Sequence, residues 1–188
     1  MRRAGHAGAF FAWPVSPERL ADFIAAVREL PVHGLCVTIP HKTAVLALLD
    51  GLSAEARAVG AANTLFWQDG ALWGHNTDVA GFLAGLRDFR AVRDTPQSAL
   101  VLGAGGAACA VLYALRNLGV PQIRLAARSG PSGAALAARF NAEFIPWEKR
   151  VSGPAQLVVN TTPLGMAGAA GAEDTPLAAA EFTALAGD

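Results

Sequence analysis

The stretch ALVLGAGGAA, residues 99–108, places a short apolar run directly before a cluster of glycines. A near-continuous apolar run such as residues 99–102 is typical of a strand that is buried on both faces in a parallel sheet. After the glycines, apolar residues recur at helical spacing as far as Gly119, which predicts a helix. The stretch therefore predicts a strand, a tight turn and a helix in succession.

Further strands are predicted downstream of this unit, at residues 123–127, 143–145 and 157–160, with a helix at residues 133–140. Strands that alternate with helices form parallel sheets with right-handed crossovers. We therefore expect an α/β domain with a parallel sheet in the second half of the chain. The Ala- and Gly-rich residues from Ala167 onward allow no structural prediction.

The glycine turn has the spacing of a dinucleotide-binding fingerprint. Gly103, Gly105 and Ala108 form its G-x-G-x-x-A variant, in which pyrophosphate can approach backbone N–H groups at a helix N-terminus. The strand before the turn and the helix after it are the context that this motif requires. The alternative interpretation is a glycine turn that only packs a helix on a strand.

Arg128 and Ser129 follow the next predicted strand. An NAD-binding protein offers an aspartate or glutamate to the ribose hydroxyl about 20 residues after the glycine turn. An arginine at this place favours a 2′-phosphate instead. We therefore expect the cofactor to be NADP(H).

The first half of the chain carries polar residues in an otherwise apolar segment, in the motifs GLCVTIPHK (residues 34–42), GAANT (60–64) and HNTD (75–78). Residues 34–39 predict a short buried strand that Pro40 ends, so Thr38 and Lys42 lie at its carboxyl end. Ligands of open α/β sheets gather at such ends. The segment therefore predicts a pocket.

Asp69-Gly70 lies between two strand-like runs, residues 62–67 and 71–75, and predicts a β-hairpin that returns Asn63 and residues 76–78 toward one end. A lysine in an apolar segment needs a charged or hydrogen-bonding partner. The hypothesis is a Lys42–Asp78 pair that faces a polyhydroxylated substrate. The alternatives are a solvated Lys42 and an Asp78 that only caps the following helix.

Helices are predicted on both sides of this segment. One begins at Ser16-Pro17, a short one begins at Thr43, one is capped by Ser53, and one follows Asp78 as far as about Phe89. Residues 90–97 are polar and contain a proline, which predicts a domain boundary there. We therefore expect a first domain over residues 1–90 and a second over residues 91–188.

Composition narrows the function classes. With 15 basic and 15 acidic residues the net charge is zero, so nucleic acid and anionic membranes are not expected partners. Cys36 and Cys109 lack metal-ligand spacing, which predicts no metal site, no disulfide and a cytoplasmic location. Residues 95–115 carry no charge, but their glycine cluster favours strand–turn–helix over a membrane span. Pro14 interrupts the N-terminal apolar run, so no signal peptide is expected.

Taken together, VTIPHK, GAANT, NTD followed two residues later by Gly81-Phe82, GAGGAA and NTTPLGM resemble shikimate dehydrogenase over residues 10–177. The resemblance implies two α/β lobes: an N-terminal substrate-binding domain and a C-terminal NADP-binding Rossmann domain. It implies NADPH-dependent reduction of 3-dehydroshikimate to shikimate in chorismate and aromatic amino-acid biosynthesis. A monomer and a homodimer are both compatible with it.

The resemblance also implies roles for individual residues. Lys42 and Asp78 match the catalytic pair, and the substrate-binding positions are Thr38, Lys42, Asn63 and Asp78. The implied NADP contacts are Gly103, Ala104, Gly105, Gly106, Ala107, Arg128, Ser129, Thr161 and Thr162. A protonated lysine beside a ketone can stabilise the alkoxide that hydride transfer produces and donate a proton to it.

The chain departs from the family pattern at several places. Cys36 and Ala127 stand where the family usually has asparagines. The family's first strand, with its paired serines, precedes Met1, and its nicotinamide-contacting segment and glutamine-bearing helix follow Asp188. The expectation is therefore a chain that is truncated at both ends and has weak activity or none. The alternatives are a quinate or aminoshikimate dehydrogenase and a non-catalytic shikimate- or nucleotide-binding paralogue.

Overall fold

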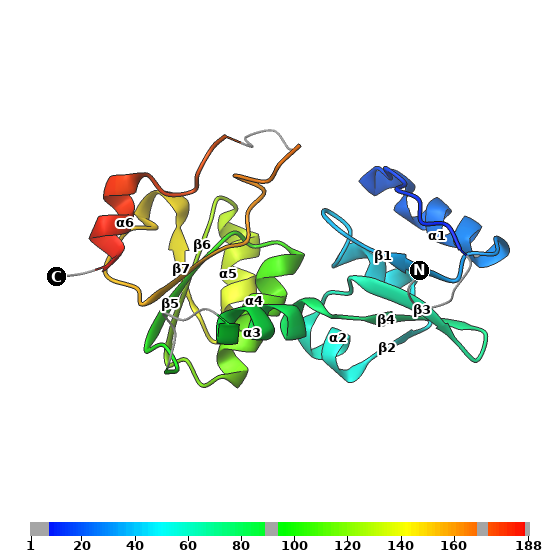
Figure 1. Cartoon of the computed structure of the whole chain (residues 1–188), viewed down its shortest axis with the longest axis horizontal. Helices are drawn as coiled ribbons and strands as arrows, with labels where there is room; N and C mark the ends of the chain where they lie inside the picture. The colour runs from blue at the N-terminus through cyan, green and yellow to red at the C-terminus, as the bar shows by residue number, and fades with distance from the viewer. Residues whose placement is uncertain (1–7, 89–93, 169–172, 187–188) are drawn as a thin grey trace.

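The computed structural model describes residues 8–88, 94–168 and 173–186, which form two α/β lobes, each built around a four-stranded sheet. Figure 1 shows the first lobe in blue and cyan and the second in green to red, with one helix, α3, between them. The predicted α/β class is confirmed. The predicted boundary at residue 90 lies outside the described residues.

In the first lobe the strands are arranged in the order β1-β3-β4-β2. β3 and β4 are the predicted hairpin, and they pair antiparallel from Thr64 opposite His75 to Gln68 opposite Ala71. Asp69 and Gly70 both have positive φ, 51° and 76°, which matches the twist of the flanking strands. The strands are β1 (Gly34–Cys36), β2 (Gly51–Leu52), β3 (Thr64–Gln68) and β4 (Ala71–His75).

Helices cover this sheet. α1 (Leu20–Glu29) buries Leu20, Ile24 and Val27 at helical spacing, and a 3₁₀ turn, η2 (Pro17–Arg19), precedes it. The helix predicted from Thr43 is a 3₁₀ helix, η3 (Ala44–Leu48). α2 (Ala54–Val59) is capped by Ser53 Oγ, as predicted, and ends at Gly60 with φ 69°.

β2 was not predicted, because two residues are too short for a periodic pattern. It pairs parallel to β4 directly after Asp50. Asp50 accepts hydrogen bonds from Arg28 Nη1 at 2.7 Å and from the Leu72 N–H at 2.7 Å. The hydrogen bond from Arg28 is the largest cause that lowers the pKa of the Asp50 carboxyl. Asp50 therefore links Arg28, near the end of α1, to β4 of the sheet.

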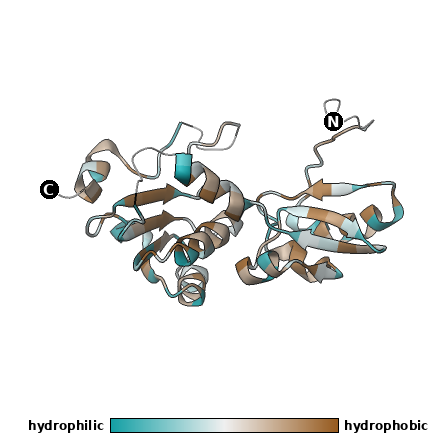
Figure 2. Ribbon diagram, turned by 60° about the horizontal axis from the view of Figure 1, so that its bottom comes forward, coloured by the Kyte–Doolittle hydropathy of each residue, from teal (hydrophilic) through white to brown (hydrophobic). Residues whose placement is uncertain are grey.

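The second lobe has the predicted parallel sheet, in the order β7-β6-β5-β8. In Figure 2 its strands are largely brown, and the central strand β5 is buried along almost its whole length, as expected for a strand covered on both faces. Its elements are β5 (Ser98–Leu102), α4 (Gly106–Asn117), β6 (Gln122–Ala127), α5 (Gly130–Arg139), β7 (Glu143–Pro146), η4 (Trp147–Lys149), β8 (Leu157–Asn160) and α6 (Ala179–Ala186). α6 lies in the Ala- and Gly-rich tail, where local patterns predict no element.

The lobes meet along α3 (Asp78–Asp88), which packs against α4. Val59, Ala61 and Val79 of the first half belong to the same buried apolar cluster as residues of α4 and β5. We call the apolar contact of these three residues with α4 the seam. The seam joins the lobes along α4.

Candidate active site

Asn76 fixes the start of α3. Its side chain is fully buried, its Nδ2 donates to the Ala61 carbonyl at 2.9 Å, and its Oδ1 accepts from the N–H groups of Asp78 (3.0 Å) and Val79 (3.3 Å). The interpretation of Asp78 as the helix cap is therefore wrong, since Asn76 caps the helix. Asp78 is the first residue of α3, and its carboxylate is left to bind another group.

That group is Lys42. Lys42 Nζ lies 2.7 Å from Asp78 Oδ2, and the side chains are 16% and 28% exposed. Asn63 Nδ2 donates to the other carboxylate oxygen, Asp78 Oδ1, at 2.8 Å. The hairpin return thus brings together the lysine, the aspartate and the asparagine that the sequence analysis singled out. The alternative interpretation, a Lys42 that is surrounded by solvent, is wrong, because its ammonium is half-buried and paired with Asp78.

The backbone around this network is held in place as well. The Ala62 N–H donates to the Lys42 carbonyl at 2.8 Å, and the Thr77 N–H donates to Asn63 Oδ1 at 2.9 Å. Thr38 is exposed one turn before Lys42, where its carbonyl accepts from the His41 N–H at 2.9 Å. Of the predicted substrate-binding residues, Lys42, Asn63 and Asp78 are in contact, and Thr38 lies on the adjoining turn.

The glycine turn of the second lobe lies directly against Lys42. A Cβ built on Gly106 would be 2.6 Å from Lys42 Cβ, which is closer than side chains approach one another. Glycine at this position therefore permits the close approach of the two lobes. The candidate catalytic pair and the candidate cofactor turn, predicted from opposite halves of the chain, form one site.

The turn lies at a switch point of the parallel sheet. β5 has β6 on one side and β8 on the other, and α/β sheets bind ligands in the crevice at such a point. Gly103 follows β5 with φ 104°, and Thr161 follows β8 and donates from Oγ1 to the Leu102 carbonyl at 2.6 Å. Asn160 Oδ1 accepts from Thr162 Oγ1 at 2.7 Å. Thr161 and Thr162 thus border the turn.

The residues present fit a dinucleotide with a 2′-phosphate. A Cβ built on Gly105 meets nothing within 4 Å, so the N-terminus of α4 has the open space that a pyrophosphate needs. Arg128 is exposed at the end of β6, and its guanidinium forms no hydrogen bond within the described residues. Ser129 Oγ accepts from Ser132 Oγ at 2.6 Å. Ala104 lies between β5 and α4, and Ala107 lies in the first turn of α4.

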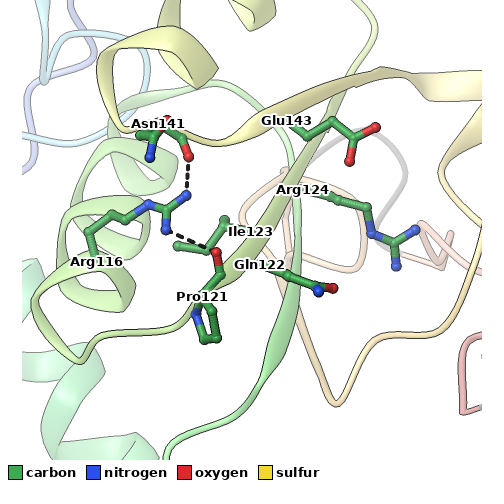
Figure 3. Close-up of a pocket in the computed structure, with 7 residues that line it drawn as sticks. All are labelled: Arg116, Pro121, Gln122, Ile123, Arg124, Asn141 and Glu143. Carbon is green, nitrogen blue, oxygen red and sulfur yellow. Dashed lines mark hydrogen bonds between the residues drawn. The ribbon is translucent and has the colours of Figure 1, made fainter.

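A separate pocket of about 230 Å³ lies at the amino ends of β6 and β7, at the end of the sheet opposite the glycine turn. Figure 3 shows Arg116 directed toward Asn141 and Pro121, with Arg124 and Glu143 on the far side. Arg116 donates to the carbonyls of Phe140, Val120, Pro121 and Asn141, and Arg124 to those of Ser152, Gly153 and Pro154. Both guanidinium groups are thus committed to backbone carbonyls, so neither is available to bind an anion in the pocket.

Over residues 8–88, 94–168 and 173–186, no three His, Cys, Asp or Glu side chains are grouped as metal ligands would be. In the same ranges no helix has both the length and the apolar character needed to cross a bilayer. Both cysteines are free thiols. Cys36 is exposed on β1 and Cys109 is buried in α4.

Asn76 lies in the HNTD motif, but the sequence analysis missed its role as the cap of α3, and its replacement by alanine should be costly. Asn76→Ala removes the cap of α3 and leaves the buried Ala61 carbonyl without its donor. We expect a loss of about 2–4 kcal/mol in the free energy of unfolding, the sum of a cap and an unsatisfied buried group. Urea unfolding measures it.

The matched control is Asn117→Ala, at an exposed position at the end of α4, which should change stability by no more than about 0.5 kcal/mol. Equal effects of the two substitutions would contradict the role of Asn76.

Known proteins resemble this chain in sequence. Residues 1–65 match the family model described as the shikimate dehydrogenase substrate binding domain. A shikimate dehydrogenase (NADP(+)) of Oleidesulfovibrio alaskensis is 51% identical over 179 residues, which are 95% of this chain and 63% of that protein. The enzyme of the same name from Paramagnetospirillum magneticum is 42% identical over 194 residues, covering 100% of this chain and 70% of that protein.

Solved structures agree. The crystal structure of shikimate 5-dehydrogenase from Thermus thermophilus, in complex with NADP(H) and shikimate, superposes with a TM-score of 0.77 at 37% identity. The match covers 96% of this chain and 66% of that one. The chain covers 63% of the length of the Oleidesulfovibrio relative, which is less than two thirds of it.

Proposed function

Because this chain belongs to the shikimate dehydrogenase family, we propose that it acts as an NADP-dependent oxidoreductase that interconverts 3-dehydroshikimate and shikimate. One observation carries the proposal: the Lys42–Asp78 pair lies against the glycine turn at the switch point of the parallel sheet. A proton donor and a dinucleotide site in contact are what a carbonyl reductase requires. The substrate is accordingly a small molecule.

The cofactor assignment follows from the groups that can donate hydrogen bonds to its phosphates. The N-terminus of α4 would hold the pyrophosphate at Gly103, Ala104, Gly105, Gly106 and Ala107, and Thr161 and Thr162 border it. Arg128 and Ser129 would hold the 2′-phosphate, because a guanidinium binds phosphate oxygens with two parallel hydrogen bonds. NADPH, when bound, supplies the hydride that reduces the substrate ketone.

The proton comes from Lys42. As the ketone oxygen gains negative charge, the ammonium at Nζ stabilises it and transfers a proton to it; in the reverse direction the neutral amine accepts the hydroxyl proton. Asp78 orients the ammonium through Oδ2, and Asn63 holds Asp78 through Oδ1. Thr38 and Asn63 would bind ring hydroxyls beside this pair.

We also propose the domain assignment: a substrate-binding domain over residues 1–90 and an NADP-binding domain over residues 91–188. The match of residues 1–65 to the substrate-binding model and the parallel sheet of the second lobe support it. A location in the cytoplasm fits two free cysteines and a substrate of central metabolism.

The test is the oxidation of shikimate by the purified chain, and the absorbance of the reduced nicotinamide measures its rate. We expect turnover with NADP⁺ that exceeds turnover with NAD⁺ by about tenfold or more, since a hydrogen bond to a charged group is worth about 1.5–3 kcal/mol. Preference for NAD⁺ would contradict the assignment of Arg128.

Substrate profiling completes this test. Faster oxidation of quinate or aminoshikimate than of shikimate would assign the chain to those dehydrogenases. Binding of shikimate in a calorimeter without any turnover would favour a non-catalytic binding protein.

A further inference from the structure

Arg139, the last residue of α5, reaches from the second lobe to the first. Its Nη2 donates to the carbonyl of Ala58 at 2.8 Å and to that of Arg57 at 3.4 Å. These carbonyls belong to the last turn of α2, where a helix leaves carbonyl oxygens unpaired and partially negative. A cation from one lobe therefore caps a helix of the other.

The contact is shaped for a guanidinium. Gly60 ends α2 with φ 69°, and a Cβ built there would lie 1.9 Å from Arg139 Nη1. Glycine at this position thus serves two purposes, because it permits the left-handed turn and leaves room for the guanidinium. On its other side the guanidinium lies over the ring of Phe140, at 5.1 Å from the ring centre. The guanidinium of the exposed Arg139 thus has contacts with both lobes.

Gly60 is the first residue of the GAANT segment, so the contact adjoins the candidate active site. The Ala61 carbonyl accepts from Asn76, which caps α3, and the Ala62 N–H binds the carbonyl of Lys42. Asn63 then binds Asp78 directly. If Gly60 moved relative to α5, residues 61–63 would move with it, and the positions of Lys42 and Asp78 would change.

Arg139 also differs in kind from the rest of the contact between the lobes. The seam is apolar, and apolar burial is non-directional, so the seam alone tolerates small rotations of one lobe on the other. Hydrogen bonds from a planar guanidinium are directional and resist rotation. At its other end, α5 follows Ser129, so one helix connects the candidate 2′-phosphate site to this contact.

We propose that Arg139 is a positioning residue, which ties α2 to α5 and thereby sets the orientation of the lobes in which Lys42 faces the glycine turn. The consequence for turnover rests on the proposed function, whereas the orientation of the lobes does not. Two separate measurements therefore test it.

The first measurement is the distance between the lobes. Spin labels on Gln68→Cys and Glu148→Cys, both exposed, mark the first and the second lobe in a Cys36→Ser background. Cys109 stays unlabelled, because burial raises the pKa of its thiol and keeps it protonated. Pulsed dipolar spectroscopy should give a single narrow distance distribution for the parent chain and a broader or shifted one for Arg139→Ala and Arg139→Gln.

Arg139→Lys, which retains the cation, should restore most of the narrow distribution. The matched control is Arg124→Ala, because Arg124 also donates to backbone carbonyls but only within the second lobe; its distribution should equal that of the parent. An unchanged distribution in Arg139→Ala or Arg139→Gln, with a native circular dichroism spectrum, would overturn the proposal.

The second measurement is kinetic. In Arg139→Ala we expect kcat to fall by about tenfold, within the range of up to about a hundredfold that a misplacement of 1 Å costs. Affinities for NADP⁺ alone and shikimate alone should stay near those of the parent, since each ligand is held mainly by one lobe. Equal kcat in the two proteins would overturn the catalytic part. If the parent itself has no turnover, the proposed function fails and the distance measurement still decides the role of Arg139.

Discussion

Lys42→Ala is expected to lower kcat by about 10²–10⁴-fold, which is the contribution that a positioned general acid or base makes. The ammonium is 2.7 Å from Asp78, and the side-chain carbons of Lys42 lie against the glycine turn, so the substitution removes a positioned proton donor beside the candidate cofactor site. The KM for shikimate should change much less than kcat, because the lysine acts mainly on charge that develops in the transition state. Steady-state kinetics with shikimate and NADP⁺ measures both constants.

The variant should fold, because Asp78 keeps its hydrogen bond from Asn63 and is partly exposed to water. Lys149→Ala, an exposed lysine on η4 of the second lobe, is the matched control and should leave kcat unchanged. A Lys42→Ala protein that retains kcat within about threefold of the parent would exclude Lys42 as the proton donor, since general acid–base catalysis contributes at least about 10².

Gly105→Val is expected to weaken NADP⁺ binding by about a hundredfold and to leave the fold intact. A Cβ at Gly105 meets nothing within 4 Å, and the residue has an extended backbone, φ −92° and ψ −172°, which valine adopts readily. The side chain would fill the open space at the N-terminus of α4 and keep phosphate oxygens from the backbone N–H groups there. Losing one or two charged hydrogen bonds at about 1.5–3 kcal/mol each accounts for this factor.

Calorimetric titration with NADP⁺ and a thermal unfolding curve separate the two parts of this expectation. The matched control is Gly85→Ala, at an exposed helical glycine of α3 that also has open space around it. It should bind NADP⁺ normally and gain about 0.5–1 kcal/mol in stability. Normal NADP⁺ affinity in Gly105→Val would mean that the turn only packs a helix on a strand.

Local patterns predicted most of the second lobe. The apolar run of β5, the glycine turn and the stripe of α4 are read within a window of some 20 residues, and each depends on neighbours in the chain. Asp69-Gly70 specified the hairpin for the same reason, because the turn type requires positive φ at both residues. β2 and α6 escaped prediction, since one is two residues long and the other lies in a tail of small residues without clear periodicity.

The network around Asp78 could be predicted in part. The pairing of Lys42 with Asp78 followed from the cost of leaving a lysine without a partner in an apolar segment. The cap of α3 was assigned to the wrong residue, because Asn76 and Asp78 both favour helix starts and their spacing to the helix does not distinguish them. The burial of Asn76 against Ala61 decides it, and burial depends on the packing of both lobes.

The sequence by itself determined the α/β class, the glycine turn and the arginine suited to a 2′-phosphate, because each depends on residue types at short spacing. Only the tertiary structure decided that Gly106 lies against Lys42 and that Arg139 caps α2. These contacts join residues 64 and 81 or more positions apart. The physical reason is that packing between lobes depends on the shapes of folded surfaces, which no local periodicity encodes.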